Sequence, residues 1–170
     1  MNSSNLKRST ILLLVFIFTT LLMGCYSFSQ TSLPTHLHSI TIYPAQNRTT
    51  QSIMGDRLTQ GIQELFRKEA PNLRQINQGA HAEFYTTLVS YYNSPMDFNA
   101  SGKVSLYQVR IQVDIQFLDR IKGYPIYEKK GLTSVGVYDI QKGESEELHG
   151  QKRALEELQT LIISNALSGW

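Results

Sequence analysis

Cys25, the single cysteine among 170 residues, has the most definite chemistry in this chain. Lys7 and Arg8 precede an apolar stretch over residues 11–23, and Gly24 comes directly before the cysteine. This order is typical of a secretory signal peptide, and the stretch is shorter than the roughly 20 apolar residues of a membrane span. A cysteine directly after the small residue is the bacterial lipoprotein variant. We therefore predict a signal peptide over residues 1–24 and lipid (palmitate) attachment to Cys25; an ordinary signal peptide with an incidental cysteine is the alternative.

The residues that could carry catalysis do not cluster in the sequence. His36 and His38 could form a two-ligand metal site if the first strand began early, but no carboxylate lies near them in sequence, and solvated histidines at a strand end are the simpler interpretation. No nucleophile elbow, phosphate-binding loop or zinc-protease motif is present. The acidic residues of the last helix are typical of a solvated helix edge. We predict no catalytic residue, no metal and no cofactor, and hence no enzyme.

Four basic residues are candidate phosphate ligands because they fall on or near two adjoining predicted strands: Arg110, Lys122, Lys129 and Lys130. Lysines also protect exposed strand edges, which is the competing interpretation. Seven of the nine tyrosines lie in the predicted sheet region. They suit either a contact surface or half-buried sheet packing.

Length and charge narrow the class of protein. Removal of residues 1–24 leaves 146 residues, enough for one domain. It also removes Lys7 and Arg8, so that 14 basic residues balance 14 acidic ones. A neutral domain argues against nucleic acid as a partner, since that requires a basic face. With Cys25 lipidated no thiol remains, so the fold depends on packing alone.

The mature chain divides into a tether over residues 25–36 and one domain over residues 37–170. We predict strands over residues 38–43, 82–92, 109–117 and 124–138, the last of them bulged near Gly131, and an exposed loop over residues 93–102. Helices are predicted over residues 51–69, capped by a Thr or Asn of the turn at 47–50, and from Gly143 to the end. Their apolar stripes are Met54, Leu58, Ile62 and Leu65, and Leu148, Leu155, Leu158, Ile162 and Ala166.

These elements predict an α+β fold in the order βαβββα. The strand over residues 109–117 alternates apolar and polar residues, so one face of the sheet should be buried and the other polar. Each amphipathic helix must bury its stripe, and the apolar face of the sheet supplies the surface. The expected architecture is two helices packed on one face of a four-stranded mixed sheet.

Several local motifs resemble the LptE family of lipopolysaccharide-assembly lipoproteins. The segment from Gly24 to Phe28 is similar to the start of the mature chain in that family, although one glycine is missing here. Residues 40–44, followed by Asn47-Arg48-Thr49, are similar to the first strand and its turn into the first helix. The long alternating strand and a closing helix that ends in Trp170 also fit, so the resemblance covers nearly the whole mature chain.

The resemblance implies a non-enzymatic protein of the Gram-negative outer membrane. The residue after Cys25 agrees with this location: it is Tyr26, whereas an aspartate there often retains a lipoprotein in the inner membrane. Such a protein plugs the lumen of the β-barrel LptD, helps the barrel to fold, and assists lipopolysaccharide insertion into the outer leaflet. It would be lipid-anchored, either facing the periplasm or inside the barrel. The alternative is a periplasmic lipoprotein that activates or binds a cell-wall synthase or a secretion system.

Overall fold

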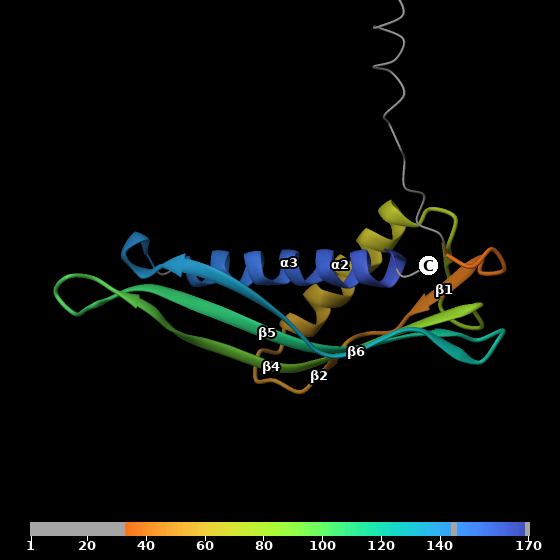
Figure 1. Cartoon of the computed structure of the whole chain (residues 1–170), viewed down its shortest axis with the longest axis horizontal. Coiled ribbons are helices and arrows are strands. Elements are labelled where there is room, and N and C mark those ends of the chain that lie inside the picture. The colour runs from red at the N-terminus through yellow and green to blue at the C-terminus, as the bar shows by residue number, and fades with distance from the viewer. Residues whose placement is uncertain (1–32, 144–145, 169–170) are drawn as a thin grey trace, which may run out of the picture. The chain divides into compact units, whose positions relative to one another are not determined.

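The computed structural model describes residues 33–143 and 146–168 (Figure 1). Cys25 and the predicted signal peptide lie outside these residues. The elements are, in chain order, β1 (Ser39–Ile42), β2 (Gln46–Asn47), α2 (Met54–Glu69), β3 (Arg74–Gln75), β4 (Ala82–Phe98), β5 (Val104–Asp119), β6 (Tyr124–Asp139), the 3-10 turn η1 (Ile140–Lys142) and α3 (Glu146–Ser168). None of the described helices combines the length and apolarity needed to cross a membrane.

The strands form one mixed sheet in the order β3-β1-β4-β5-β6, with β2 also paired to β4. β1 runs parallel to β3 and β4, whereas β4, β5 and β6 are antiparallel. Both helices lie on one side of this sheet (Figure 1). The predicted α+β fold with two helices and a mixed sheet is confirmed, but the predicted four strands were wrong, because the sheet has six. The two extra strands, β2 and β3, have two residues each and carry no alternation.

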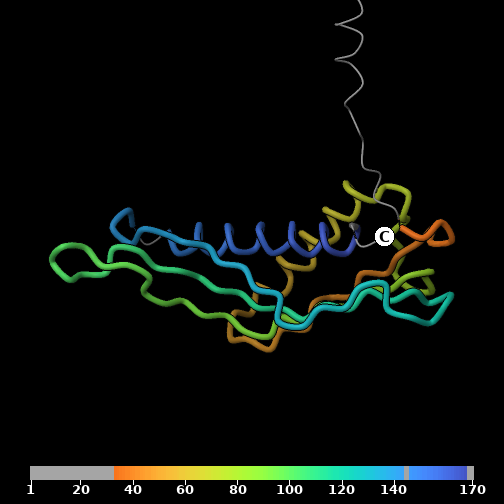
Figure 2. The backbone as a smooth tube through the Cα atoms, viewed as in Figure 1, coloured from red at the N-terminus to blue at the C-terminus, as the bar shows by residue number. Residues whose placement is uncertain are grey.

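The long hairpins dominate the sheet (Figure 2). β4 continues to Phe98, so the loop predicted over residues 93–102 was wrong in its first half. Pro95 stands opposite Tyr107 within the ladder, and a proline is tolerated there because β4 has no neighbour on its other side beyond Leu88, where β2 ends. The predicted bulge near Gly131 is confirmed by a register shift, and Gly131 itself has a φ of 69°.

A core of aromatic and branched side chains joins the helices to the sheet. The rings of Phe66 on α2, Phe84 on β4 and Phe117 on β5 are all buried, with centroid separations of 5.1–5.9 Å. The predicted stripe of α3 is buried except for Leu148, which is 49% exposed. That residue was assigned to the core wrongly: it lies in the first turn of α3 and lines a shallow surface pocket together with Arg57 of α2.

The start of α2 differs from the prediction. Its N-cap residue is Ile53, which provides no side-chain hydrogen bond. Asn47 instead organises the preceding turn, because its Oδ1 accepts from the Thr49 amide and its Nδ2 donates to the Gln51 carbonyl. The polar turn residues therefore fix the approach to the helix and do not cap it. The C-terminal end is as expected, with Ala70 as C-cap directly before Pro71.

α3 approaches β6 unusually closely through small residues. A Cβ on Gly136 of β6 would lie 1.9 Å from the Gly150 carbonyl oxygen and 2.7 Å from the Ala154 amide nitrogen. Ser134, two residues earlier on the same face, donates its hydroxyl hydrogen to the Ala154 carbonyl at 2.7 Å. This contact fixes α3 against one face of the sheet.

Candidate functional site

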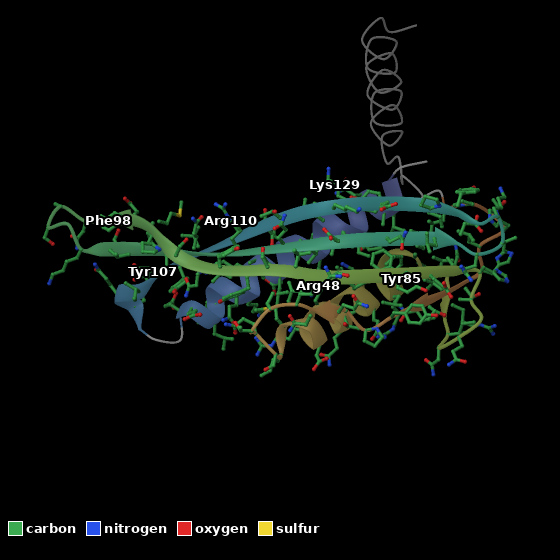
Figure 3. The ribbon with its side chains drawn as sticks, turned by 90° about the horizontal axis from the view of Figure 1, so that it is seen from below. Arg48, Tyr85, Phe98, Tyr107, Arg110 and Lys129 are labelled. Carbon is green, nitrogen blue, oxygen red and sulfur yellow. The ribbon has the colours of Figure 1, made fainter. Side chains whose placement is uncertain are left out.

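The face of the sheet opposite the helices carries a continuous polar row on β5. Alternation sends Val109, Ile111 and Val113 into the core, with no measurable exposure. The intervening side chains point the other way, and we call this surface the open face (Figure 3). Its central row on β5 is Gln108, Arg110, Gln112, Asp114 and Gln116. Neither of the two described helices covers it (Figure 1).

Hydrogen bonds between neighbouring strands order this row. Ser90 on β4 donates to Gln112 Oε1 at 3.2 Å. The amide of Gly131, in the bulge of β6, donates to Asp114 Oδ1 at 2.8 Å. The open face is therefore a fixed surface of carboxamides and hydroxyls. Such groups can hydrogen-bond to the polar side chains or backbone of another protein.

Two tyrosines gather at the β1 end of the open face. Tyr43 and Tyr85 stack with centroids 4.6 Å apart, and both hydroxyls donate to the Glu83 carboxylate. Arg120 Nε lies 3.2 Å from the same carboxylate. Burial, and then the hydrogen bond and charge of Glu83, raise the pKa of Tyr85 to about 12. Tyr85 is thus a neutral hydrogen-bonding group at every physiological pH.

Other tyrosines pack in the interior. The two roles predicted for the tyrosines, contact surface and sheet packing, therefore apply to different residues. Tyr91 is on the helix side, where its hydroxyl donates to Glu147 and accepts from Gln151 of α3. Tyr138 is 5% exposed and stacks on Tyr107. Tyr92, in contrast, is 63% exposed on β4.

The structure separates the four basic candidates. Arg110 lies near the middle of the open face, opposite Tyr92 and Val135. Lys129 and Lys130 are neighbours on the edge strand β6, about five residues along the ladder from Arg110, or roughly 17 Å at strand spacing. Lys122 is in the β5–β6 turn, farther away. All four are exposed and have no carboxylate partner among the described residues, but they do not form one patch.

His36 has a partner that lies far from it in sequence. Its Nε2 is 2.6 Å from Oδ2 of Asp119, a side chain at the end of β5 with no exposure. The interpretation of His36 as a solvated residue was therefore wrong. His38 is directed to another partner, with its ring 5.8 Å from that of His81. Across residues 33–143 and 146–168, no three histidine, cysteine or acidic side chains are grouped as a metal site would require.

Asp119 makes stability depend on pH in the acid range. Burial alone would raise the pKa of Asp119, but hydrogen bonds from the Lys122 amide, His36 and the Ile121 amide outweigh it and hold the pKa below its ordinary value. The ionised form is therefore favoured by folding. Its contribution is present above the unfolded pKa of about 3.9 and is lost as pH falls through the folded value.

We therefore expect Asp119→Asn to lower the free energy of unfolding by about 2–3 kcal/mol at pH 7, since charge-assisted hydrogen bonds are lost from a buried site. The deficit should shrink as the pH falls below about 4. Thermal unfolding of both proteins between acid and neutral pH measures this, with Asp56→Asn, on an exposed first turn of α2, as the control. A deficit independent of pH would contradict the assignment.

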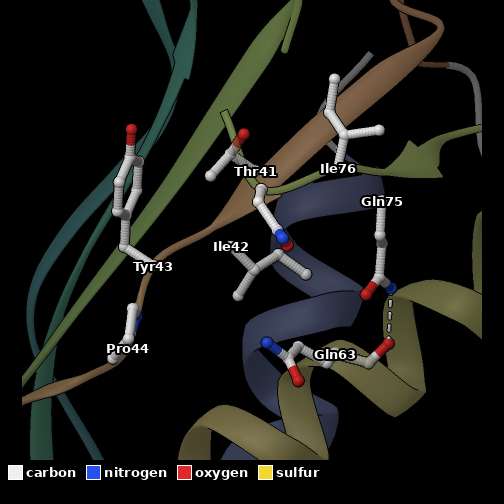
Figure 4. Close-up of a pocket in the computed structure, with 8 residues that line it drawn as sticks. Thr41, Ile42, Tyr43, Pro44, Gln63, Gln75 and Ile76 are labelled. Carbon is white, nitrogen blue, oxygen red and sulfur yellow. Dashed lines mark hydrogen bonds between the residues drawn. The ribbon is translucent and has the colours of Figure 1, made fainter. Parts of the chain in front are cut away.

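A small pocket opens where β1 loses its neighbour β3 (Figure 4). Its volume is about 320 Å³, and its wall contains Tyr43, Gln63 and Gln75, the last of which donates to the Gln63 carbonyl. The lining contains no charged side chain. Thr41 is 3% exposed beside it, and its hydroxyl has no partner within the described part of the chain. The hydroxyl oxygen is itself shielded, and the rest of the lining combines carboxamides with the Tyr43 ring and the apolar side chains of Ile42, Pro44 and Ile76.

Comparisons with solved structures show that this α+β fold occurs in several other bacterial proteins. Protein XCC0632 from Xanthomonas campestris is similar, with a TM-score of 0.58 and 10% identity, covering 80% of this chain and 89% of its own. The hypothetical protein CT253 from Chlamydia trachomatis has a TM-score of 0.54 and 9% identity, covering 78% and 99%. Rare lipoprotein B from Shewanella oneidensis has a TM-score of 0.50 and 14% identity, covering 76% and 95%. At these identities the likeness is one of fold.

The family follows from the sequence. The model of the LptE family, described as lipopolysaccharide-assembly, matches residues 37–165. Because this match covers most of the chain, the protein belongs to the LptE family, and the predicted membership is confirmed. A search of curated proteins found no match.

Proposed function

We propose that this protein is an outer-membrane lipoprotein, anchored through Cys25, that occupies the lumen of an LptD-type β-barrel and assists lipopolysaccharide insertion into the outer leaflet. Membership of the LptE family supports a role of this protein in lipopolysaccharide assembly. The observation that carries the finer assignment is the open face, a long polar sheet surface that neither described helix covers.

The chemistry of the open face suits the interior of a barrel. The lumen of an outer-membrane barrel is polar, so a plug should offer hydrogen-bonding groups without many unpaired charges. Three glutamines, one arginine and one aspartate make up the central row, and Asp114 already accepts from the bulge of β6. The opposite side supplies the packed core that lets the plug keep its shape inside the barrel.

The role that we propose is binding and positioning, with no catalytic step and no cofactor. Lipopolysaccharide carries phosphates, which guanidinium and ammonium groups bind by charge-assisted hydrogen bonds. Arg110 is the best placed of the four candidates because it stands on the open face. Lys122, Lys129 and Lys130 are further proposed contacts. Lys129 and Lys130 lie on the edge strand β6, where lysines also prevent pairing with the strands of other molecules.

Depletion of the protein in its own cells tests this function. We expect lipopolysaccharide to disappear from the cell surface and to return when a wild-type copy is supplied. A copy with Arg110→Glu should restore it incompletely, whereas Arg67→Glu, an equal charge reversal on exposed α2, should restore it fully. A normal amount of lipopolysaccharide on the surface of depleted cells would contradict the proposal.

A further inference from the structure

Apolar side chains gather at the end of the β4–β5 ribbon, far from the core. Met96 is 52% exposed and Phe98 is 58% exposed, within three residues of each other. The turn η1 packs beside the same end of β5, where Ile140 is 44% exposed. Strand pairing places Asp97, Leu106 and Asp139 in one row across the sheet, so Ile140 lies about 10 Å from the end of β4. We call residues 96–104 together with η1 the ribbon tip.

The ribbon tip extends beyond the end of α3 (Figure 1). Its apolar side chains therefore have no core to pack against. A hairpin end normally carries polar turn residues, and a group of exposed apolar side chains marks an interaction site.

The turn at the ribbon tip pairs several of its own polar groups. Asn99 Oδ1 accepts from the amides of Ser101 and Lys103 and from the Ser101 hydroxyl. The Asn99 amide donates to the Lys103 carbonyl, and the Gly102 amide donates to the Asn99 carbonyl. Each backbone group that is paired within the turn leaves water at a lower cost, which favours contact with the interface of a lipid phase over deep insertion.

The apolar groups point to both sides of the ribbon. Phe98 pairs with Val104. Val104 is an even number of residues from Leu106 and Arg110 along β5, so it shares the open face with them, and Phe98 points to that face too. η1, in contrast, lies on the side of the helices (Figure 1). A flat protein partner would meet only one side, whereas a fluid lipid phase surrounds both.

Charged side chains also belong to the ribbon tip, and Asp97 stands between Met96 and Phe98. Lys103 and Lys142 are exposed there, together with Asp97 and the partly exposed Asp139. Lysine stems can lie along an apolar phase while their ammonium groups reach the headgroups. Asp97 Oδ1 accepts from the Phe98 amide, so this carboxylate is held at the turn by a hydrogen bond.

We propose that the ribbon tip is a lipid-binding element that inserts Met96, Phe98 and Ile140 into the headgroup and acyl boundary of a bilayer. The sheet face and the ribbon tip then have separate tasks: the open face meets protein, and the ribbon tip meets lipid. The proposal needs a membrane but no barrel, so it can fail while the proposed function stands.

A tryptophan reporter tests this in the lipidated full chain, reconstituted into phosphatidylethanolamine and phosphatidylglycerol vesicles with brominated acyl chains. Trp170, the only tryptophan, is replaced by phenylalanine. Phe98→Trp then reports on the ribbon tip. Ile53→Trp, at a 63% exposed position before α2, is the matched control. Thermal unfolding of both variants checks that they fold like the parent.

We expect the indole emission of the Phe98→Trp variant to shift to the blue and to be quenched by bromine at least about twofold more than that of the Ile53→Trp variant, since interfacial segments are buried roughly 5–10 Å into this boundary. Equal quenching in the two variants would overturn the proposal. So would a Phe98→Trp emission that shifts to the blue only when a barrel protein is added and stays unquenched, because the ribbon tip would then be a protein contact.

Discussion

Gly136→Ala is expected to destabilise this protein by about 3 kcal/mol or more, at the upper end of the range for overpacked cores. The added methyl would meet the Gly150 carbonyl oxygen at 1.9 Å and the Ala154 amide nitrogen at 2.7 Å. Both obstacles are backbone atoms of α3, so relief requires moving the whole helix away from β6. Calorimetry should show a melting temperature lower by about 10 °C for a domain of this size.

Gly61→Ala is the matched control, since it makes the same chemical change in α2. The methyl there would approach Gln159 Nε2 at 1.9 Å, but this is the end of a flexible side chain that can rotate away. The gain in helix propensity, about 1 kcal/mol, offsets the loss of the bond from Gln159 Nε2 to the Arg57 carbonyl. Equal destabilisation by both substitutions would contradict the close approach of α3 to β6.

Cys25→Ala is expected to abolish lipidation completely, because the chain has no other thiol. Each buried methylene contributes about 0.8 kcal/mol to membrane binding, and even one acyl chain gives an association constant of about 10⁴ M⁻¹. Labelled palmitate should therefore enter the wild-type protein and not the variant. Mass spectrometry should place the wild-type mature N-terminus at residue 25.

Ser27→Ala, two residues after the cysteine, is the control for this substitution and should incorporate the label normally. Label retained by Cys25→Ala would contradict the assignment. So would a mature wild-type chain that begins at another residue, since the sequence would then contain an ordinary signal peptide.

Elements with a strong local period could be predicted from the sequence. The alternation over residues 109–117 identifies both the strand and its buried face, and the spacing of Leu58 and Ile62 identifies α2. Gly131 signals the bulge because a glycine interrupts an otherwise regular strand. These features depend on neighbours within a few residues, so one sequence is enough to see them.

Features that depend on distant residues could not be predicted. His36 and Asp119 are 83 residues apart, and nothing local links them. Pro95 lies inside a strand only because β4 has become an edge there, which follows from where β2 ends. Likewise, the four candidate basic residues fall on or near two adjoining strands, but the register that places Arg110 well away from Lys129 is not visible in the sequence.

The most direct test of the central claim is photocrosslinking from the open face, followed by affinity isolation from gently solubilised membranes. A photoreactive amino acid at Gln112, in the middle of the polar row on β5, should couple this chain to a β-barrel protein of far greater size. Recovery of a cell-wall synthase or a secretion component in its place, or of no coupled protein at all, would contradict the claim that this face lies against the inside of a barrel.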